Sequence, residues 1–563
     1  MKNLAILLAA AAVIALPFLF RQKTPDGAWR SGDPVLVIIT PHNEAIRYEF
    51  GRAFSRWHAE RFGRPVKIDW RNIGGTTEIT RYLDSETLSA FRSWWTGPQG
   101  KSWPRGGTFA LTDHRFRSSD PELTALRQAL LSTDNPAAFS TGIDLFFGGG
   151  EYDHSRAFAK GLTVAPWPNG IPKELVETAE GIELIPERLG GELWRAEGFV
   201  GTALSTFGIV YNSDRLAGSG IQTPPASWSD LTHPVYHRQL GLADPTKSGS
   251  IAKAFEMIIH QQINQSVETA GFSAKTETAP SPKDPAYTAA IEHGWVNGIN
   301  LVRLISANAR YFTDSAGKVA IDVSTGDAAA GLSIDFYGRY QAETSRNPAT
   351  GEERMHYVTP AGGSSVSCDP IGLVRGAPHR ELAVRFIEFT VSEAGQKLWN
   401  YRPGTPGGPE KFALRRLPIR RDFYPSDRKE IQARFEAHRP YTSDDLGDAG
   451  INPYQLAAQF TYVGRWTGRH FNIHRDLIRA MCLDSGDELS AAWAAIARAG
   501  GPEAAPEAMA ALLALPPGLS WESALDTERF NSANRMETMR EWIIFFRAQY
   551  REARRLAEGG RHA

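Results

Sequence analysis

The sequence predicts an α/β protein of two lobes, followed by a C-terminal α-helical extension. The chain has 563 residues, of which 42% are hydrophobic and 22% charged, so it exceeds the size of one typical domain. From residue 34 onward, short apolar runs alternate with amphipathic helical patterns, which favours parallel sheets with helical crossovers. The final segment, 424–563, is rich in Ala, Arg and Glu with helical periodicity, which indicates the extension.

The alternation of strands and helices begins close to the N-terminus. Residues 35–40 form an apolar, β-branched run of the kind that is buried on both faces of a sheet. An amphipathic helix is predicted at 44–62 and a second strand at 66–70. The loop Gly74-Gly75-Thr76-Thr77 then leads into another helix. This order predicts a parallel sheet with right-handed crossovers.

Later segments repeat this alternation. Residues 85–135 interrupt it with turn-rich, aperiodic sequence, which we expect to form an insertion. A helix is predicted at 380–398, where Leu382, Phe386 and Phe389 fall on one side. Further short strands are predicted at 143–147, 207–211, 239–243, 319–323 and 371–374.

Charge and cysteine content limit the kinds of partner and site. The chain carries 62 basic and 63 acidic residues, which argues against a nucleic-acid partner because such a partner favours a basic face. Its two cysteines, Cys368 and Cys482, are too few for a disulfide scaffold or a cysteine-based zinc site. Two alternatives remain for them: one disulfide in an oxidising compartment, or two unpaired buried thiols, which we favour.

The first residues carry an export signal. Lys2 precedes an apolar run at 4–20, and Arg21 and Lys23 close it. This run is short for a bilayer span and long for the core of a signal peptide. We therefore expect residues 1–23 to be either a cleaved signal peptide or an uncleaved N-terminal membrane anchor. Both place the remaining chain in the periplasm or another extracytoplasmic space.

Four ordered segments carry a resemblance to a known family. They are residues 207–216, 225–231, 241–250 and 369–379. In this order they resemble the bacterial extracellular solute-binding proteins that are related to the iron(III)- and anion-binding subunits of ABC importers. The resemblance implies the type II periplasmic-binding-protein fold, in which two α/β lobes, joined by two crossing strands, close over a ligand.

The resemblance also implies a division of the chain. It covers residues 34–420, with lobe 1 near 34–150 plus later segments and lobe 2 near 205–355. The insertion at 85–135 and the extension at 424–563 are not explained by it.

The function that the resemblance implies is solute capture for transport. Such a protein is the substrate-binding subunit of an ABC importer: it works as a monomer, holds a small-molecule or metal ligand and delivers it to a permease in the inner membrane. The alternative is a membrane-anchored ligand sensor or scaffold that uses the same fold without transport. The helical extension and the N-terminal segment are the features that motivate this alternative.

Catalytic motifs are missing from the sequence. His233 and His237, and likewise His470 and His474, have the spacing of zinc-binding helices, but neither pair has the glutamate that such enzymes need after the first histidine. No Gly-x-Ser-x-Gly nucleophile motif is present. We therefore predict that the protein is not an enzyme.

The candidate ligand-binding residues lie in loops. Open α/β sheets bind ligands beyond the carboxyl ends of their strands, and helix N-termini there attract anions. Two such loops from opposite lobes favour a small oxyanion or a phosphorylated compound, although simple N-capping by Thr76 or Thr77 is the alternative. The candidates are His42, Asn43, Glu44, Gly75, Thr76, Thr77, Ser248, Gly249, Ser250, Asp335 and Tyr337.

Iron(III) is the second ligand class that stays open. His42, Glu44 and Tyr337 are candidate metal ligands, because oxygen ligands with one imidazole suit Fe(III). Iron-binding relatives commonly offer two adjacent tyrosines, however, and no such pair occurs in this sequence. Apart from iron(III) bound as a ligand, no cofactor is expected.

Overall fold

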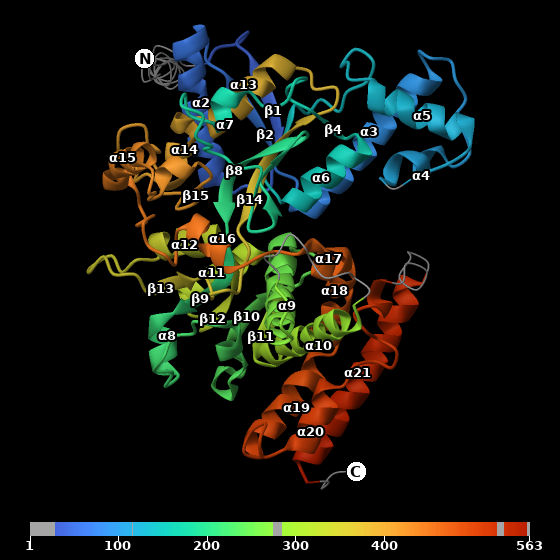
Figure 1. Cartoon of the computed structure of the whole chain (residues 1–563), viewed down its shortest axis with the longest axis vertical. Coiled ribbons are helices and arrows are strands. Elements are labelled where there is room, and N and C mark those ends of the chain that lie inside the picture. Colours follow the sequence, from blue (N-terminus) through green and yellow to red (C-terminus); the bar gives the residue numbers. More distant parts are fainter. Residues whose placement is uncertain (1–28, 115, 274–283, 526–533, 560–563) are drawn as a thin grey trace, which may run out of the picture.

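The computed structural model describes residues 29–114, 116–273, 284–525 and 534–559, and it confirms two α/β lobes with a helical extension (Figure 1). The segment expected to be a signal peptide or anchor, 1–23, lies outside these residues. Within the described ranges, no helix is both long enough and apolar enough to cross a membrane.

Lobe 1 is built on one mixed sheet. Its strands are β1 (Val35–Ile39), β2 (Lys67–Arg71), β3 (Leu145–Phe147), β4 (Thr163–Val164), β7 (Arg195–Ala196), β8 (Phe199–Ser205), β14 (Ser367–Val374) and β15 (Leu417–Pro418). They lie in the order β15-β8-β14-β3-β1-β2, and β4 and β7 add short pairings. Strands β1, β2 and β3 are parallel, whereas β14 runs antiparallel to β3 and β8.

Lobe 2 is built on a second mixed sheet. Its strands are β9 (Phe207–Asn212), β10 (Leu240–Ala243), β11 (Ala309–Thr313), β12 (Ala330–Ile334) and β13 (Met355–Val358). They lie in the order β11-β10-β12-β9-β13, with β10, β11 and β12 parallel and β9 antiparallel to both neighbours.

Two pairs of consecutive strands carry the chain between the lobes. Strand β8 continues into β9 through Thr206, and β13 continues into β14 through 359–366. In each sheet, an antiparallel strand lies beside three parallel strands, and this strand is the one that enters from the other lobe. It is β9 in lobe 2 and β14 in lobe 1. This arrangement confirms the two crossing strands of the expected fold.

Helices cover both faces of the lobe 1 sheet. They are α2 (Glu44–Phe62), α13 (Arg380–Val391) and α14 (Glu393–Asn400) on one face, and α3 (Thr76–Thr96) and α6 (Glu151–Lys160) on the other. Side chains of a strand alternate between the faces. Leu36 and Ile38 of β1 therefore pack with the first group, while Val37 and Ile39 pack with the second. This alternation explains why the whole run is apolar.

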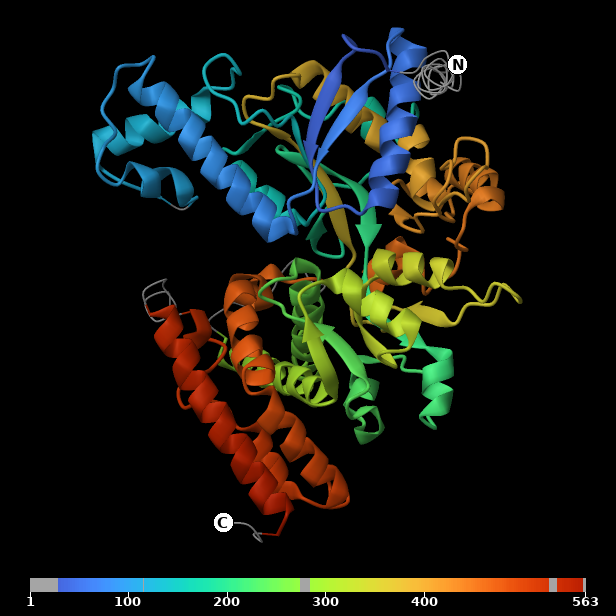
Figure 2. The same cartoon turned by 180° about the vertical axis from the view of Figure 1, so that it is seen from behind.

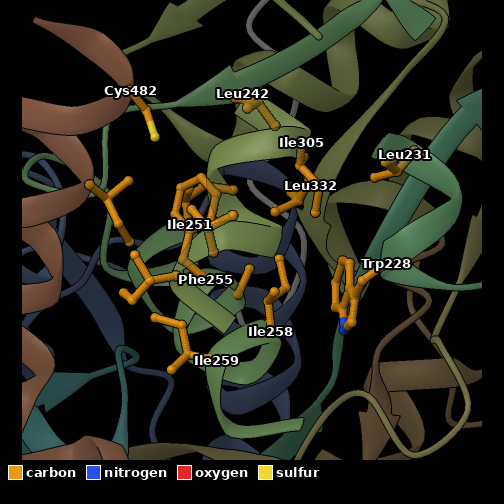
Figure 3. Packing of buried hydrophobic residues seen from close by; sticks show 14 of the residues in the cluster. Trp228, Leu231, Leu242, Ile251, Phe255, Ile258, Ile259, Ile305, Leu332 and Cys482 are labelled. Carbon is orange, nitrogen blue, oxygen red and sulfur yellow. The ribbon is translucent and has the colours of Figure 1, made fainter. Parts of the chain in front are cut away.

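The core of lobe 2 includes part of the extension. Helix α9 (Gly249–Thr269) packs along α10 (Pro285–Ala307), and a Cβ atom on Gly298 would lie only 2.5 Å from Ile259 Cα. Figure 3 shows Ile251, Phe255 and Ile258 of α9 together with residues of the sheet and of α10, and Cys482 of the extension beside them.

The extension divides between the two lobes. Its main helices are α15 (Lys429–His438), α16 (Pro453–Gln459), α17 (Gly464–Thr467), α18 (Phe471–Ile478), a π-helical turn (Arg479–Leu483), α19 (Gly486–Arg498), α20 (Pro506–Leu513) and α21 (Arg535–Ala557). The elements up to α16 add to the core of lobe 1, whereas those from α17 onward pack on lobe 2 (Figure 1). Residues 460–463 connect the two parts.

Two local predictions were wrong, and residues 85–135, expected to be an aperiodic insertion, are more regular than their sequence indicated. The strand predicted at 319–323 is a helix, α11 (Ala316–Thr325), which buries Val319 and Val323 at helical spacing and leaves Ile321 exposed. Residues 85–135 are largely helical: α3 continues to Thr96, and two further helices follow it, α4 (Gly107–Thr112) and α5 (Pro121–Ser132). The helix predicted at 380–398 is two helices, because Ser392 is extended and accepts the Gly395 N–H as the cap of α14.

Candidate ligand-binding site

The two lobes face each other where the parallel strands of both sheets end. In lobe 1, β1, β2 and β3 lead into α2, α3 and α6; in lobe 2, β10, β11 and β12 lead into α9, α11 and α12 (Asp335–Thr344). Because the carboxyl ends of parallel strands meet at one edge of a sheet, the N-termini of these helices gather there. Figure 2 shows that α3 of lobe 1 begins close to lobe 2 and runs away from it.

The two loops predicted to converge from opposite lobes do face each other. We call these loops, 74–77 and 246–250, the rim. A Cβ atom placed on Gly249 would lie 4.0 Å from Thr76 Oγ1, and one on Gly75 would lie 4.0 Å from the carbonyl oxygen of Lys247. These are ordinary contact distances, so the lobes are closed on each other at this point.

The rim offers backbone donors. Helix α3 begins after Gly75, and no side chain caps its first turn, so the alternative in which Thr76 or Thr77 is the N-cap is wrong. Helix α9 begins after Ser248, whose hydroxyl accepts the Ile251 N–H at 3.4 Å. The first N–H groups of a helix have no partner within it. The two N-termini therefore present N–H groups and positive dipole ends toward the same space.

Acidic side chains lie beside these N-termini. A Cβ atom on Gly75 would be 3.2 Å from Glu78 Oε2, so this carboxylate folds back over its own helix start. Asp153 lies in the first turn of α6, and burial raises its pKa to about 6, although the Gly150 N–H and Arg475 act in the opposite direction. An anionic ligand would therefore displace Glu78 or share the rim with it.

The second group of candidates surrounds the crossing strands, in a set of residues that we call the hinge cluster: His42, Ser205, Asp335, Asp369 and Arg416. His42 Nε2 lies 2.7 Å from Asp369 Oδ2, and Arg416 pairs with the same carboxylate and donates to Ser205 Oγ at 2.9 Å. Burial acts to raise the pKa of Asp369, but Arg416 and His42 outweigh it and hold the value at about 2.

Arg416 joins both lobes through its guanidinium. Its Cζ lies 4.2 Å from the ring centre of Phe336 in lobe 2 and 5.0 Å from that of Trp399 in lobe 1. Only 1% of its side chain is exposed, so both its charge and its stacking are protected from water. The charge pair with Asp369 lies within lobe 1, and the stacking of Arg416 on Phe336 makes the buried contact with lobe 2.

Asp335 and Tyr337 lie on the lobe 2 side of the hinge cluster. Asp335 is fully buried, its Oδ1 accepts the Phe336 N–H at 2.8 Å, and its Oδ2 has no hydrogen-bond partner. Burial raises its pKa to about 6 against the effect of Arg339 and Arg416. Burial also raises the pKa of Tyr337, whose ring packs on Gly317 of α11.

The proposed metal ligands His42 and Glu44 differ in burial. His42 is buried with its Nε2 held by Asp369, whereas Glu44 is exposed at the start of α2. Asn43 is occupied as the N-cap of α2 and accepts the Ile46 N–H at 3.1 Å. Among the described residues, no group of three or more His, Cys, Asp or Glu side chains could hold a metal ion.

Several residues of the site were missed by sequence reasoning. Asp369 lies within a segment of the resemblance, but Arg416 has no local pattern that indicates its partner. The same is true of Arg475 and Arg479, which reach the rim from the extension. Such pairings join positions that are far apart along the chain, and periodicity carries no information about them.

The two cysteines are unpaired and buried, one in β14 of lobe 1 and one in the extension on lobe 2. The favoured interpretation, two buried thiols, is therefore confirmed.

Comparison with known proteins confirms the resemblance. Residues 171–432 match the family model described as bacterial extracellular solute-binding protein, and this range contains all four segments that suggested it. A protein of Haemophilus influenzae that is described as uncharacterized is 23% identical over 266 residues. The match spans 47% of this chain and 61% of that protein, which is less than two thirds of its length.

Solved structures with a related arrangement are periplasmic binding proteins. AfuA from Actinobacillus pleuropneumoniae, solved with exogenous fructose-6-phosphate, has 16% identity and a TM-score of 0.41, covering 65% of this chain and 81% of that one. A ferric binding protein from Campylobacter jejuni has 12% identity and a TM-score of 0.42, covering 79% and 99%. At these low scores, the assignment of the fold rests on the strand order and crossings described above.

Proposed function

From the match of residues 171–432 to bacterial extracellular solute-binding proteins, we propose that the chain is the substrate-binding subunit of an ABC-type importer. It captures a small solute between its lobes in the periplasm and delivers it to a permease in the inner membrane. The observation that carries this proposal is the rim, where loops of both lobes meet across the cleft.

The ligand that the rim supports best is a small oxyanion or a phosphorylated compound. Backbone N–H groups at the starts of α3 and α9 point toward one space, and Lys247 stands in the second loop. Helix N-termini bind phosphate and carboxylate groups through these N–H groups and the helix dipole. Iron(III) is the weaker candidate. The Nε2 atom of His42 is paired with Asp369 in the interior, whereas Glu44 is exposed to solvent.

The proposed mechanism is a shift between open and closed states. A ligand that touches both rim loops gains contacts only when the lobes close, so its binding increases the closed population. The crossing strands keep the two lobes connected while they move. The transport partner then distinguishes the closed, loaded state from the open one.

Two measurements test the proposal. Native mass spectrometry with elemental analysis of the purified protein would identify what co-purifies with it. Titration calorimetry would then compare inorganic phosphate, fructose 6-phosphate, citrate and iron(III) citrate. We expect a bound anion without stoichiometric iron and at least one phosphorylated compound that binds with a one-to-one ratio. Stoichiometric iron would identify iron(III), and not an anion, as the ligand. The absence of binding across a broad solute panel would contradict solute capture.

A further inference from the structure

The extension makes a third connection between the lobes, beside the two crossing strands. At 460–463 the Tyr462 N–H donates to the Gly190 carbonyl in lobe 1 at 2.8 Å, and the next N–H, of Val463, donates to His260 Nε2 of α9 in lobe 2 at 2.8 Å. Gly191 has a positive φ of 82°, and a Cβ atom there would collide with the Tyr462 carbonyl. The turn between β5 (Arg188–Leu189) and β6 (Glu192–Leu193) therefore needs a residue without a side chain where it contacts this segment.

Beyond this connection, α18 and the residue that directly follows it, Arg479, reach the rim. Arg475 donates from Nε to the Pro245 carbonyl at 2.7 Å and from Nη2 to the Thr246 carbonyl at 2.6 Å. Arg479 donates to Asp244 Oδ2 at 2.5 Å, and Asp244 Oδ1 in turn accepts the Thr246 N–H at 2.8 Å. These bonds hold the backbone immediately before Lys247 and Gly249, the residues that face lobe 1.

The same helix also contacts lobe 1. The ring of Phe471 at the start of α18 lies 5.7 Å, centre to centre, from the ring of Tyr152 in the first turn of α6. Burial lowers the pKa of Arg475, and the charge of Asp153, the next residue of α6, opposes this shift. Tyr152 is 41% exposed, so this contact lies at the surface of the molecule. Because α6 belongs to lobe 1 and α18 packs on lobe 2, the contact is lost when the lobes separate.

We propose that α18 forms a third wall of the cleft, in which Arg475 and Arg479 position the 246–250 loop and the Tyr152–Phe471 pair latches lobe 1 onto the extension in the closed state. The role of the loop in ligand binding rests on the proposed function, whereas the latch does not require a ligand. Any contact made only in the closed state raises the closed population by its own free energy. For one aromatic pair this corresponds to roughly a two- to tenfold change in the ratio of closed to open molecules.

The latch is tested without a ligand by measuring the distance between the lobes. Spin labels on S89C in α3 and A217C in α8 (Ser213–Gly218) would occupy exposed positions, since both native cysteines are buried. We expect Tyr152→Ala and Phe471→Ala each to move the distance distribution of the ligand-free protein toward longer values, with little further change in the double variant. Phe109→Ala, which removes an aromatic ring that is 60% exposed in α4, is the matched control. Unchanged distributions in both single variants, with normal folding, would overturn the latch.

The positioning role is tested by hydrogen exchange of the rim. Arg475→Gln and Arg479→Gln should accelerate amide exchange in a peptide that contains residues 244–250, while Arg551→Gln, an exposed arginine of α21 that pairs with Glu488, should not. Arg475→Gln and Arg479→Gln should also raise the Kd for inorganic phosphate, while their Tm stays no lower than that of Arg551→Gln. Unaltered exchange in both variants would overturn positioning by α18. If no solute binds while exchange and distances respond as expected, the importer role fails and the third wall stands.

Discussion

At the rim the lobes meet through glycines, hydroxyls and backbone N–H groups, whereas at the hinge cluster the buried guanidinium of Arg416 in lobe 1 stacks on Phe336 of lobe 2. The charged side chain within the rim, Lys247, is half exposed, so little charge is desolvated there. In the hinge cluster, Arg416 and Asp369 are removed from water together, and separating them would leave each charge buried alone. The difference indicates that the contacts at the rim are weaker than those in the hinge cluster, where the buried charge pair holds Arg416 in place against Phe336.

The largest expected effect is at the hinge cluster. Arg416→Met should lower the free energy of unfolding by about 3–5 kcal/mol, because it leaves the Asp369 carboxylate buried with only His42 beside it. Denaturant titration at pH 7 measures this loss. Arg551→Met removes an exposed pair and should cost less than about 1 kcal/mol. Equal losses of stability in the two variants would show that the buried pair of Arg416 and Asp369 stabilises the fold no more than an exposed pair does.

The second effect depends on pH. The pKa of Asp335 is raised from 3.8 to about 6 by burial, so the folded protein binds more protons than the unfolded chain between these values. Stability from this group is therefore present below about pH 4 and is lost as pH rises through about 6. The stability of Asp335→Asn relative to the wild type should therefore increase by about 2 kcal/mol between pH 4.5 and pH 7.5. Denaturant titration of both proteins at both pH values measures this change, and Asp445→Asn, at an exposed aspartate, is the control. An equal stability difference between variant and wild type at the two pH values would contradict the prediction.

A third prediction removes one donor from the rim. Gly249 is the first residue of α9, where proline fits a helix well, and the extended conformation of Ser248 is compatible with a following proline. Gly249→Pro should weaken binding of inorganic phosphate roughly tenfold, as expected for one lost hydrogen bond to a charged group. Calorimetry measures this change. Lys429→Pro, at the first position of α15 and away from the cleft, should leave affinity unaltered.

The smallest effect concerns the acid that competes with an anion. Glu78→Gln removes the carboxylate beside Gly75 and should tighten phosphate binding roughly two- to fivefold at low salt, the scale of one charge near a helix terminus. The gain should shrink at high salt, because this site is partly exposed. Glu86→Gln, farther along α3, is the control. A gain of equal size in both variants would show that general charge, and not the rim, is responsible.

Local patterns were enough to predict much of lobe 1 and the positions of the rim loops. The alternation of side chains in Val35–Ile39 and the helical spacing in Glu44–Phe62 identified the first strand and helix, and Asn43 ends the loop between them. The rim loops were found because strands of a parallel sheet end at one edge. At 319–323 the same approach failed, since alternating β-branched residues also match one face of a short helix.

The sequence by itself determined the two-lobed α/β class, the helical character of the extension and the loops from which a ligand site would be built, because these depend on periodicities that a few neighbouring residues display. Only the tertiary structure decided that Arg416 lies between Phe336 and Trp399, and that Arg475 supports the rim of a lobe more than two hundred residues earlier in the chain. These contacts arise from how the lobes and the extension pack together. Their energies depend on burial and direction in space, which local sequence does not encode.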